Sequence, residues 1–328
     1  METGFRSDEL MTTSTTALNL LGASQYVKAS KAHNTQRAYR AAWAEFAAFC
    51  DKSGLCALPA TPQAVIAFVT ALAEKGIRPA TIQVKLAGIS FAHRTAHQND
   101  PTDFEDVKIV MAGIRRELGT APAKKAPATF EDVCKMVDCL PDDLGGVRDR
   151  AMLLVGFAGA FRRSELVALD VADIHFNGAT MTATLRRSKT DQDGAGLQKT
   201  IPYLTGKYDP ASALREWLKA SGITSGPIFR KVDRWGCVGS ERLTDRVVAL
   251  VVKLAAEAAG LEPSQFAGHS LRAGFITSSA LAGTPEWAIM EQSGHKSERV
   301  LRGYIRACGI GAQDAVRRAF GQLTEGIE

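Results

Sequence analysis

Residues 268–306 read GHSLRAGFITSSALAGTPEWAIMEQSGHKSERVLRGYIR, and the rest of the chain is best understood from this segment. It holds His269 and Arg272, then His295, and then Tyr304. Residues three apart share a face of a helix, so His269 and Arg272 are expected to lie together. The glycine before His269 and the serine after it place both at a helix N-terminus, where backbone N–H groups favour anions. The segment therefore predicts a helical site that meets an anion with cationic and proton-carrying side chains.

Two further cationic positions precede this segment. Arg162 follows an apolar helical segment and precedes Glu165, whose carboxylate can pin a guanidinium, while Lys189 lies in a polar turn. Arginine suits the non-bridging oxygens of a phosphodiester because its planar fork donates two hydrogen bonds and keeps its charge. A phenol such as Tyr304 has a pKa of about 10 and needs activation by arginines or by a base such as His269. Taken singly, each residue has an ordinary alternative: a surface ion pair, a solvated lysine, a polar histidine or a half-buried tyrosine.

The chain has 328 residues, 45% of them hydrophobic, and a net charge of +5. This length predicts about two domains of roughly 100–200 residues, each able to bury a core. The mild positive charge permits nucleic-acid binding without requiring it. No apolar run is long enough to span a membrane, and the polar N-terminus is unlike a secretory signal. The six cysteines form neither a C-x-x-C motif nor zinc spacing, so we expect reduced thiols in a cytosolic protein and no metal site.

The first part of the chain predicts a flexible arm at residues 1–24, followed by a helical bundle at residues 25–118. Apolar residues recur at helical spacing, and two of the helix starts carry a proline in the first turn. The expected helices begin at Asn34 or Thr35, at Thr61–Pro62, at Pro79 and at about Phe104. Short helices with tight connections indicate an all-α bundle. Residues 119–128 hold two prolines, two lysines and no large apolar residue, which predicts an extended linker.

Residues 129–328 predict a mostly helical α+β domain with a small antiparallel sheet. Thr129 and Asp132 resemble a capping box at its first helix. Residues 179–187 and 198–203 are strand-like on either side of a glycine-containing turn, which predicts a β-hairpin with Lys189 near its tip. Further helices are expected from residue 210, at about 244–259, at about 271–281 and at 312–323. The expected fold class is therefore mainly α, with an N-terminal helical bundle and this mixed C-terminal domain.

In its ordered set of residues the chain resembles the tyrosine site-specific recombinases, also called the phage integrase family. The family's series Arg, Lys, His-x-x-Arg, His or Trp, and Tyr is matched by Arg162, Lys189, His269 with Arg272, His295 and Tyr304. Residues 268–272, 293–295 and 304–306 are most similar to the Cre branch, and the similarity extends from about residue 32 to the end. Departures from Cre occur at His295, where Cre has tryptophan, and at Val84, Lys85 and Gly88 on a base-facing helix. The resemblance therefore implies the family's mechanism with a target sequence other than that of Cre.

The implied mechanism joins the protein covalently to DNA. The tyrosine attacks a DNA phosphate, forms a 3′-phosphotyrosyl bond and frees a 5′ hydroxyl, and the hydroxyl of a partner strand reverses the step. The energy of the broken bond is kept in the phosphotyrosine, so neither ATP nor a metal is required and no cofactor is expected. The implied roles are nucleophilic attack by Tyr304, transition-state stabilisation by Arg162, Arg272 and His295, proton transfer by His269, general acid catalysis by Lys189, and support of Arg162 by Glu165.

The resemblance also implies partners. A SAM-like core-binding bundle and the catalytic domain would clamp double-stranded DNA with an inverted-repeat target site, without a membrane or a small-molecule substrate. The protein would be a monomer when free and a homo-tetramer on two DNA sites in the cytoplasm, associated with the nucleoid. Helix 312–323 would dock into a neighbouring protomer, with packing on its own domain as the alternative. DNA contacts are expected at Arg37, Gln83, Lys85, Lys124, Lys125, Arg242 and Arg246, where a solvated helix face is the alternative.

The outcome of the reaction stays open at this point. The same chemistry serves a recombinase that exchanges strands between two sites, a chromosome-dimer resolvase, a transposon or phage integrase, and a nicking–closing topoisomerase. A DNA-binding protein that keeps the fold without catalysis is an alternative from another class. The complete set of six matching residues argues against it.

Overall fold

The computed structural model describes residues 33–120, 125–186 and 196–307. The chain divides into two compact units, an N-terminal unit, Met1–Ala123, and a C-terminal unit, Lys124–Glu328. Among the described residues, no helix combines the length and apolar character needed to cross a membrane. Four positions from the sequence predictions lie outside the described residues: the arm at residues 1–24, Lys124, Lys189 and the helix at residues 312–323.

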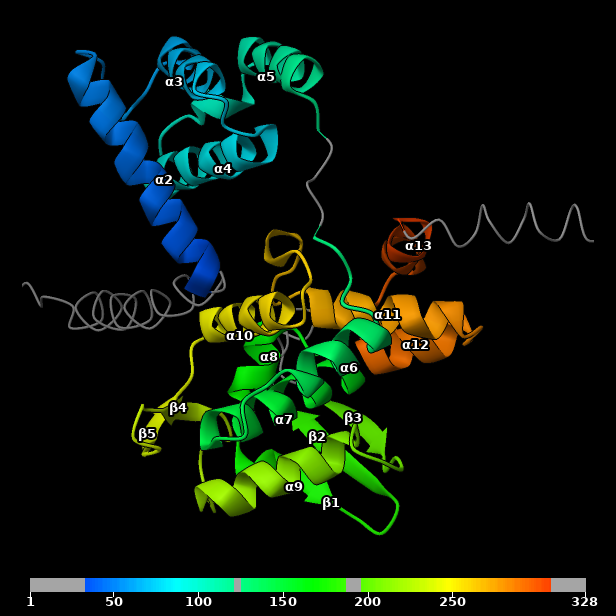
Figure 1. Cartoon of the computed structure of the whole chain (residues 1–328). Coiled ribbons are helices and arrows are strands. Elements are labelled where there is room, and N and C mark those ends of the chain that lie inside the picture. The colour runs from blue at the N-terminus through cyan, green and yellow to red at the C-terminus, as the bar shows by residue number, and fades with distance from the viewer. Residues whose placement is uncertain (1–32, 121–124, 187–195, 308–328) are drawn as a thin grey trace, which may run out of the picture. The chain divides into compact units, whose positions relative to one another are not determined.

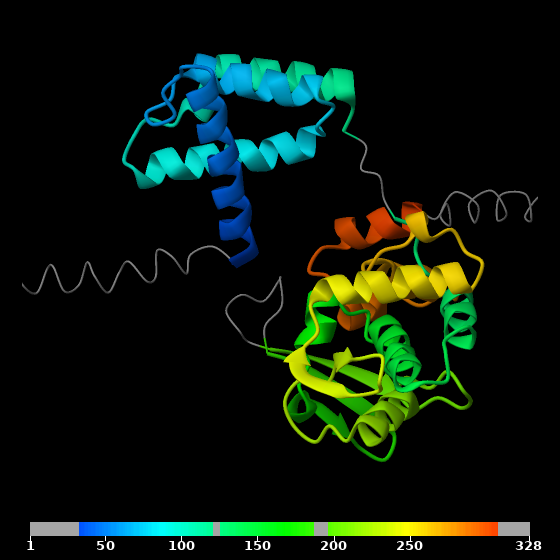
Figure 2. The ribbon, with the colours of Figure 1, turned by 60° about the vertical axis from the view of Figure 1, so that its left-hand side comes forward.

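The N-terminal unit is built from helices around a compact apolar core. Its elements are α2 (His33–Lys52), α3 (Pro62–Glu74), α4 (Pro79–Thr95), the 3-10 turn η1 (Pro101–Asp103) and α5 (Glu105–Leu118). Figure 2 shows α2 crossing α4, with α3 and α5 side by side. Phe46 of α2, Phe68 of α3 and Ile82 of α4 are fully or almost fully buried in this core. The hydroxyl of Thr61 accepts a hydrogen bond from the Ala64 N–H at 3.2 Å, so the expected cap does start α3.

The C-terminal unit combines helices with two small antiparallel sheets (Figure 1). Its helices are α6 (Phe130–Asp138), α7 (Leu144–Ala158), α8 (Arg163–Ala168), α9 (Pro210–Ser221), α10 (Asp245–Ala258), α11 (Ser270–Leu281), α12 (Glu286–Ser293) and α13 (Glu298–Ala307), with 3-10 turns η2 (Val171–Asp173) and η3 (Pro263–Gln265). One sheet has the order β1 (Ile174–Phe176), β2 (Thr180–Leu185) and β3 (Leu197–Pro202). The other pairs β4 (Arg230–Val232) with β5 (Val238–Arg242).

Helix α7 lies at the centre of the C-terminal unit. Every residue from Ala151 to Phe157 is buried, and a helix that is apolar all round must be covered on all sides. The chain leaves α7 through Gly159, Ala160 and Phe161 and reaches Arg162 directly. The buried second half of α7 therefore leads directly into the segment that carries the first of the predicted catalytic residues.

The fold prediction of a mainly helical chain with a small antiparallel sheet is confirmed. The expected hairpin forms between β2 and β3, with Met181 paired to Ile201. Strand β1 and the β4–β5 hairpin were not predicted, because strands of three to five residues give too little alternation to read. Helix α2 begins at His33, just before the expected Asn34. Ser270 does not cap α11, because it is the first helical residue and its hydroxyl accepts from the Ala267 N–H.

Candidate active site

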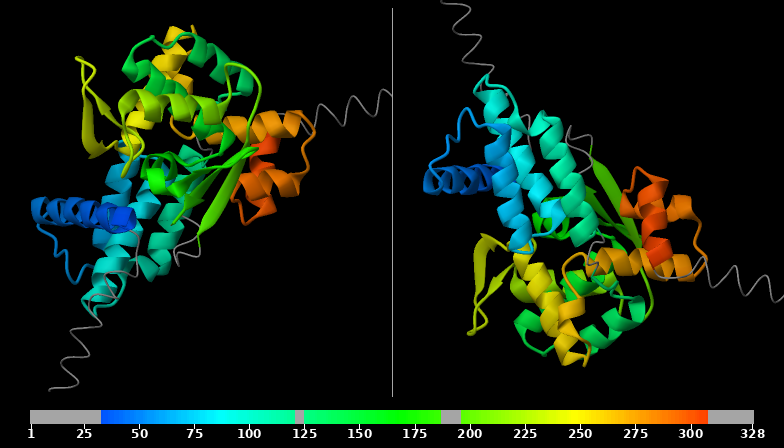
Figure 3. Two further views of the ribbon diagram at one scale, coloured as in Figure 1. Left: turned by 90° about the horizontal axis from the view of Figure 1, so that it is seen from below. Right: turned by 90° about the horizontal axis from the view of Figure 1, so that it is seen from above.

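The structure brings five of the six predicted catalytic residues together in the C-terminal unit. Helices α11, α12 and α13 gather beside the strands of the larger sheet (Figure 3), and they carry or precede the histidines, the second arginine and the tyrosine. The sixth residue, Lys189, lies outside the described residues. The five described residues are Arg162, His269, Arg272, His295 and Tyr304.

Arg162 is held by the carboxylate that the sequence suggested. It precedes the first residue of α8, and its backbone N–H donates to Glu165 Oε2 at 2.9 Å. Its guanidinium donates to the other oxygen of the same carboxylate at 2.5 Å. Glu165 is only 5% exposed, and such a charge-assisted pair fixes both the backbone and the side chain of Arg162.

Arg272 and His295 form the buried floor of the site. Arg272 is 1% exposed and donates to the Ala160 carbonyl at 2.8 Å and to His295 Nε2 at 3.2 Å. His295 follows Gly294, whose left-handed φ of +67° ends α12 and turns the chain. The hydroxyl of Ser293 lies 2.7 Å from His295 Nδ1. The imidazole therefore has a defined contact at each ring nitrogen.

The charges at this floor perturb one another. Burial, with the nearby charge of Arg162, lowers the pKa of Arg272 to about 10, so it remains a cation at pH 7. Burial, with the charges of Arg272 and Arg162, lowers the pKa of His295 to about 4. A neutral imidazole is what the contact with Arg272 requires, because only an unprotonated ring nitrogen can accept its hydrogen bond. The site thus holds an excess of positive charge that a bound anion would stabilise.

Tyr304 lies against both histidines of the site, with its ring centre 5.7 Å from that of His295 and 6.0 Å from that of His269. Its hydroxyl oxygen is 2.6 Å from His269 Nε2, within the range for proton transfer from a phenol to a base. The body of the half-buried ring packs on the apolar cluster of Ile276, Ile289 and Leu301. Tyr304 comes from α13 and His269 from the residue before α11. The packing of α13 on α11 therefore brings the phenol and the imidazole together within one subunit.

The expected DNA-contact residues occupy varied surroundings. Arg37 on α2 and Arg246 on α10 are exposed. Gln83 accepts a hydrogen bond from Arg115, and Lys85 pairs with Glu45. Lys125 donates to the Ser264 carbonyl at 2.6 Å. Arg242 differs from the others, because its guanidinium donates to Asp170 and to the Val167 carbonyl at the end of α8 and so holds the fold of its own unit.

One buried lysine in the site was not found by sequence reasoning. Lys199 on β3 is 1% exposed and donates to the carbonyls of Gly159 and Gln292. The sequence did carry a signal, because alternation along β3 places position 199 on the same inward face as Leu197 and Ile201. A cation at an inward strand position is unusual enough to indicate a special role.

Comparisons with known proteins identify the family of this chain. The sequence profile described as "Phage integrase family" matches residues 128–308. The integrase/recombinase xerD homolog of Selenomonas ruminantium is 36% identical over 305 residues, covering 92% of this chain and 89% of that protein. The recombinase cre of Escherichia phage P1 is 26% identical over 281 residues, covering 80% of each.

The fold has the same relatives. A crystal structure of a lambda integrase dimer bound to a COC' core site superimposes with a TM-score of 0.58 at 16% identity, covering 92% of this chain and 82% of that one. Identity this low concerns the fold alone. The family profile spans more than half of the chain, and the xerD homolog aligns with nearly all of it. The protein therefore belongs to the phage integrase family and is a tyrosine recombinase.

Proposed function

We propose that this enzyme cuts and rejoins DNA strands at a specific site through a 3′-phosphotyrosyl bond formed by Tyr304. The observation that carries the proposal is the 2.6 Å contact between the Tyr304 hydroxyl and His269 Nε2, beside the buried guanidinium of Arg272. A nucleophile within reach of a base, beside positive charges that are already fixed in place, is the arrangement that nucleophilic catalysis on a phosphate needs.

The proposed step balances as follows. The phenolic oxygen attacks phosphorus while His269 takes the phenolic proton, and the bond from phosphorus to the 5′ oxygen breaks. The 5′ oxygen leaves with a proton supplied by Lys189, for which a lysine near the tip of the hairpin is suited as general acid. A 5′ hydroxyl from a partner strand then attacks the phosphotyrosine and regenerates the phenol. One phosphate ester bond forms for each one that breaks, so the proposed step needs neither ATP nor a metal.

The proposed roles of the remaining residues follow from their contacts. Arg162 and Arg272 hold the non-bridging oxygens, and each is fixed beforehand, by Glu165 and by the Ala160 carbonyl respectively. Donors that are already oriented need little reorganisation when charge develops. His295, which accepts a hydrogen bond from Arg272 and contacts Ser293, assists by orienting the Arg272 guanidinium toward the same phosphate.

The two units have separate proposed tasks. The N-terminal unit and the C-terminal unit grip opposite sides of a DNA duplex with an inverted-repeat site, and the linker at residues 119–128 follows the duplex. Exposed cations such as Arg37 and Arg246, with Lys124 and Lys125 of the linker, suit phosphate contacts. Gln83 and Lys85 on α4 suit base edges in the major groove. Arg242 is the weakest of these candidates, because its guanidinium is held at once by Asp170 and by the backbone carbonyls of Val167 and Leu169.

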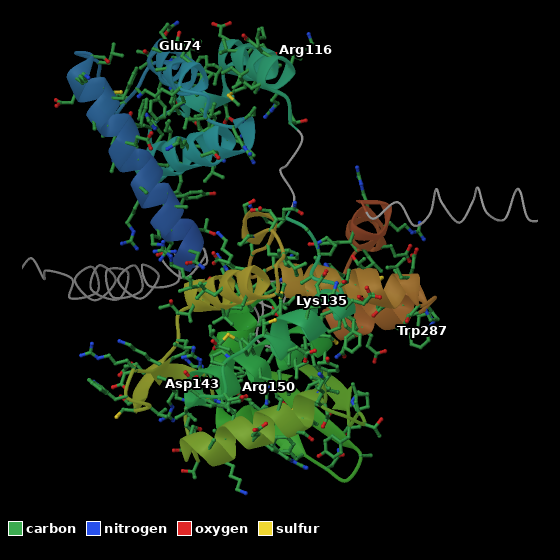
Figure 4. All side chains as sticks on the ribbon, viewed as in Figure 1. Glu74, Arg116, Lys135, Asp143, Arg150 and Trp287 are labelled. Atoms are coloured by element: carbon green, nitrogen blue, oxygen red, sulfur yellow. The ribbon has the colours of Figure 1, made fainter. Side chains whose placement is uncertain are left out.

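A tetramer on two DNA sites, formed from free monomers, is the proposed assembly. Helix 312–323 would dock on a neighbouring protomer. Support comes from exposed apolar side chains on α11 and α12: Leu281 is 63% exposed and Trp287 69%. Figure 4 shows Trp287 projecting from α12. Exposed apolar side chains on two helices that pack together would suit the apolar face expected for residues 312–323. The DNA substrate makes the cytoplasm, at the nucleoid, the proposed location.

The proposed outcome of recombination follows from the similarity to Xer-type recombinases. Identity to the xerD homolog, at 36%, exceeds identity to cre, at 26%. This ordering favours a chromosome-dimer resolvase or a transposon or phage integrase over a reaction of the Cre type. Selection of bound fragments from the source genome distinguishes them, because a resolvase site lies in the chromosome and an integrase site at the ends of a mobile element.

A nicked suicide substrate tests the chemistry. When cleavage occurs beside the nick, the short freed strand diffuses away and the covalent adduct accumulates. The wild-type protein should become joined to DNA, and Tyr304→Phe should bind the same DNA without joining. Tyr208→Phe is the matched control, because Tyr208 is a tyrosine of the same unit whose hydroxyl donates to Asp138 at 2.8 Å. A wild-type protein that binds its site tightly yet forms no adduct refutes the proposal and favours a DNA-binding protein without catalysis.

A further inference from the structure

Lys199 lies in the core of the C-terminal unit, against the loop that carries Arg162. It sits on β3 opposite Ala183 of β2, and its side chain points inward. Its ammonium donates to the carbonyl of Gly159 at 2.7 Å and to the carbonyl of Gln292 at 2.5 Å. It also lies 5.1 Å from the centre of the Phe161 ring, a distance at which the ring face attracts a cation.

The two carbonyls that bind Lys199 belong to the ends of two helices. Gly159 caps the C-terminus of α7, and Gln292 lies in the last turn of α12. Such carbonyls have no partner within their own helix, and they carry the negative end of its dipole. Among the described residues, no carboxylate lies within ion-pair distance of Lys199. The helix ends therefore supply the direct partners of this buried ammonium, and the Glu165 carboxylate acts on it only at longer range.

Each of these carbonyls comes shortly before a residue of the site. Gly159 precedes Arg162 by three residues, and Gln292 precedes His295 by three residues. The same loop receives two more side chains, because Gln292 Nε2 donates to the Ala158 carbonyl at 2.8 Å and Arg272 donates to the Ala160 carbonyl at 2.8 Å. Three consecutive carbonyls at the C-terminal end of α7, those of Ala158, Gly159 and Ala160, are thus bound from α12, β3 and α11 in turn.

The loop between α7 and Arg162 needs this support because its backbone is unusual. Ala160 has a φ of +45°, a left-handed conformation that side chains other than glycine rarely adopt. A Cβ at Gly159 would lie 2.0 Å from the Phe161 ring, so the close fold-back of Phe161 requires glycine there. A strained loop persists only when its surroundings hold it in place.

We infer that Lys199 is a positioning residue of the recombination reaction, which ties the loop before Arg162 to the end of α12 before His295 and so sets the rate of strand cleavage without touching DNA. The inference rests on the proposed function. The ammonium is too enclosed to reach a leaving 5′ oxygen, which separates its task from that of Lys189. An apolar residue would suit its neighbours Leu197 and Ile201 better, since burying a charge is costly. A lysine at this position offsets that cost, because its ammonium joins two helix ends through one side chain.

Single-turnover cleavage of the suicide substrate, at saturating DNA, tests this inference. Lys199→Met should lower the cleavage rate by about 10²-fold, the usual effect of moving reacting groups by about 1 Å. The affinity for uncleaved DNA should stay within about threefold of wild type, because only the transition state loses an interaction. Lys199→Arg keeps donors at the same place and should recover part of the rate. Gln198→Met, on the exposed side of the same strand, is the matched control and should cleave normally.

A substrate with sulfur in place of the bridging 5′ oxygen separates positioning from acid catalysis. A thiolate leaves without being protonated, so this substrate should restore cleavage by Lys189→Ala. It should not restore cleavage by Lys199→Met, because misplaced cations slow both substrates alike. Rescue of Lys199→Met by sulfur would overturn the inference and make Lys199 the acid. A cleavage rate of Lys199→Met within about threefold of wild type would overturn it as well.

Circular dichroism decides first whether Lys199→Met is folded. If it is not, Gln292→Met takes its place. This variant removes the hydrogen bond to the Ala158 carbonyl at the end of α7, just before the same loop, and it changes no charged residue. The same loss of rate, again without rescue by sulfur, is expected, and normal cleavage by Gln292→Met would overturn the inference. Failure of the proposed function looks different, because the wild-type protein itself would then form no adduct.

Discussion

The buried ammonium of Lys199 has a consequence for stability that can be measured without DNA. Burial, together with the positive charges of Arg272 and Arg162, lowers the pKa of Lys199 from 10.5 to about 7. In the unfolded chain the lysine is solvated and keeps its ordinary pKa. The drop corresponds to about 5 kcal/mol, since each pKa unit is worth about 1.4 kcal/mol. The side chain is only 1% exposed, so solvent screens this effect little.

The sign of the pH dependence follows from which state holds the proton. Below about pH 7 the lysine is protonated in both states, and the cost of burying its charge is fully present. As the pH rises from about 7 toward 10.5, the folded protein releases the proton while the unfolded chain keeps it. The free energy of unfolding therefore increases over this range. Of the full effect, about 3 kcal/mol should appear between about pH 7 and pH 10.

Urea unfolding of the wild type and of Lys199→Met isolates this contribution. Other titrating groups cancel in the difference between the two free energies of unfolding, which should grow in favour of the wild type as the pH rises. Fluorescence of Trp217, which is buried on α9, reports the C-terminal unit once Trp43 of the other unit is replaced by phenylalanine. Lys219→Met on the exposed side of α9 is the control and should show no pH trend. A difference for Lys199→Met that is flat from pH 6 to pH 10 would refute the reasoning.

Two further outcomes follow from named contacts. His269→Ala removes the base beside the Tyr304 hydroxyl, so adduct formation on the suicide substrate should slow by about 10²–10⁴-fold. An adduct rate within about threefold of wild type would contradict the role of His269. Gly274→Ala would place a Cβ 1.5 Å from the Ala128 carbonyl oxygen and should lower the free energy of unfolding by about 3 kcal/mol or more. A Cβ at Gly113 would meet no atom within 4 Å, so Gly113→Ala should leave the free energy of unfolding unchanged or raise it slightly. Equal changes in the free energy of unfolding for the two variants would contradict the close approach at Gly274.

Much of the helical framework could be predicted because its signals are local. The capping box of Thr129 and Asp132 is present at α6, and Thr61 caps α3 with proline at the first turn. Such signals lie within one helical turn of the boundary they mark. The hairpin of β2 and β3 was also readable, since alternation extends over six residues in each strand. Pairings between short strands, such as β4 with β5, depend on the surrounding packing and leave no comparable pattern.

The candidate site shows which structural features cannot be predicted from the sequence. A motif identifies residues that meet the substrate, because their chemistry is unusual for a surface, and five of these do lie together. It does not identify what holds them, since the support comes from backbone carbonyls, which every residue possesses. The two partners of Lys199 lie 40 and 93 residues away in sequence. The amino-acid types at Gly159 and Gln292 do not indicate that their backbone carbonyls accept these hydrogen bonds. Yet the inward position of Lys199 on an alternating strand was visible, and a buried cation must find acceptors somewhere. A charged residue at a core position therefore predicts that backbone groups converge on it, even where the sequence cannot say which.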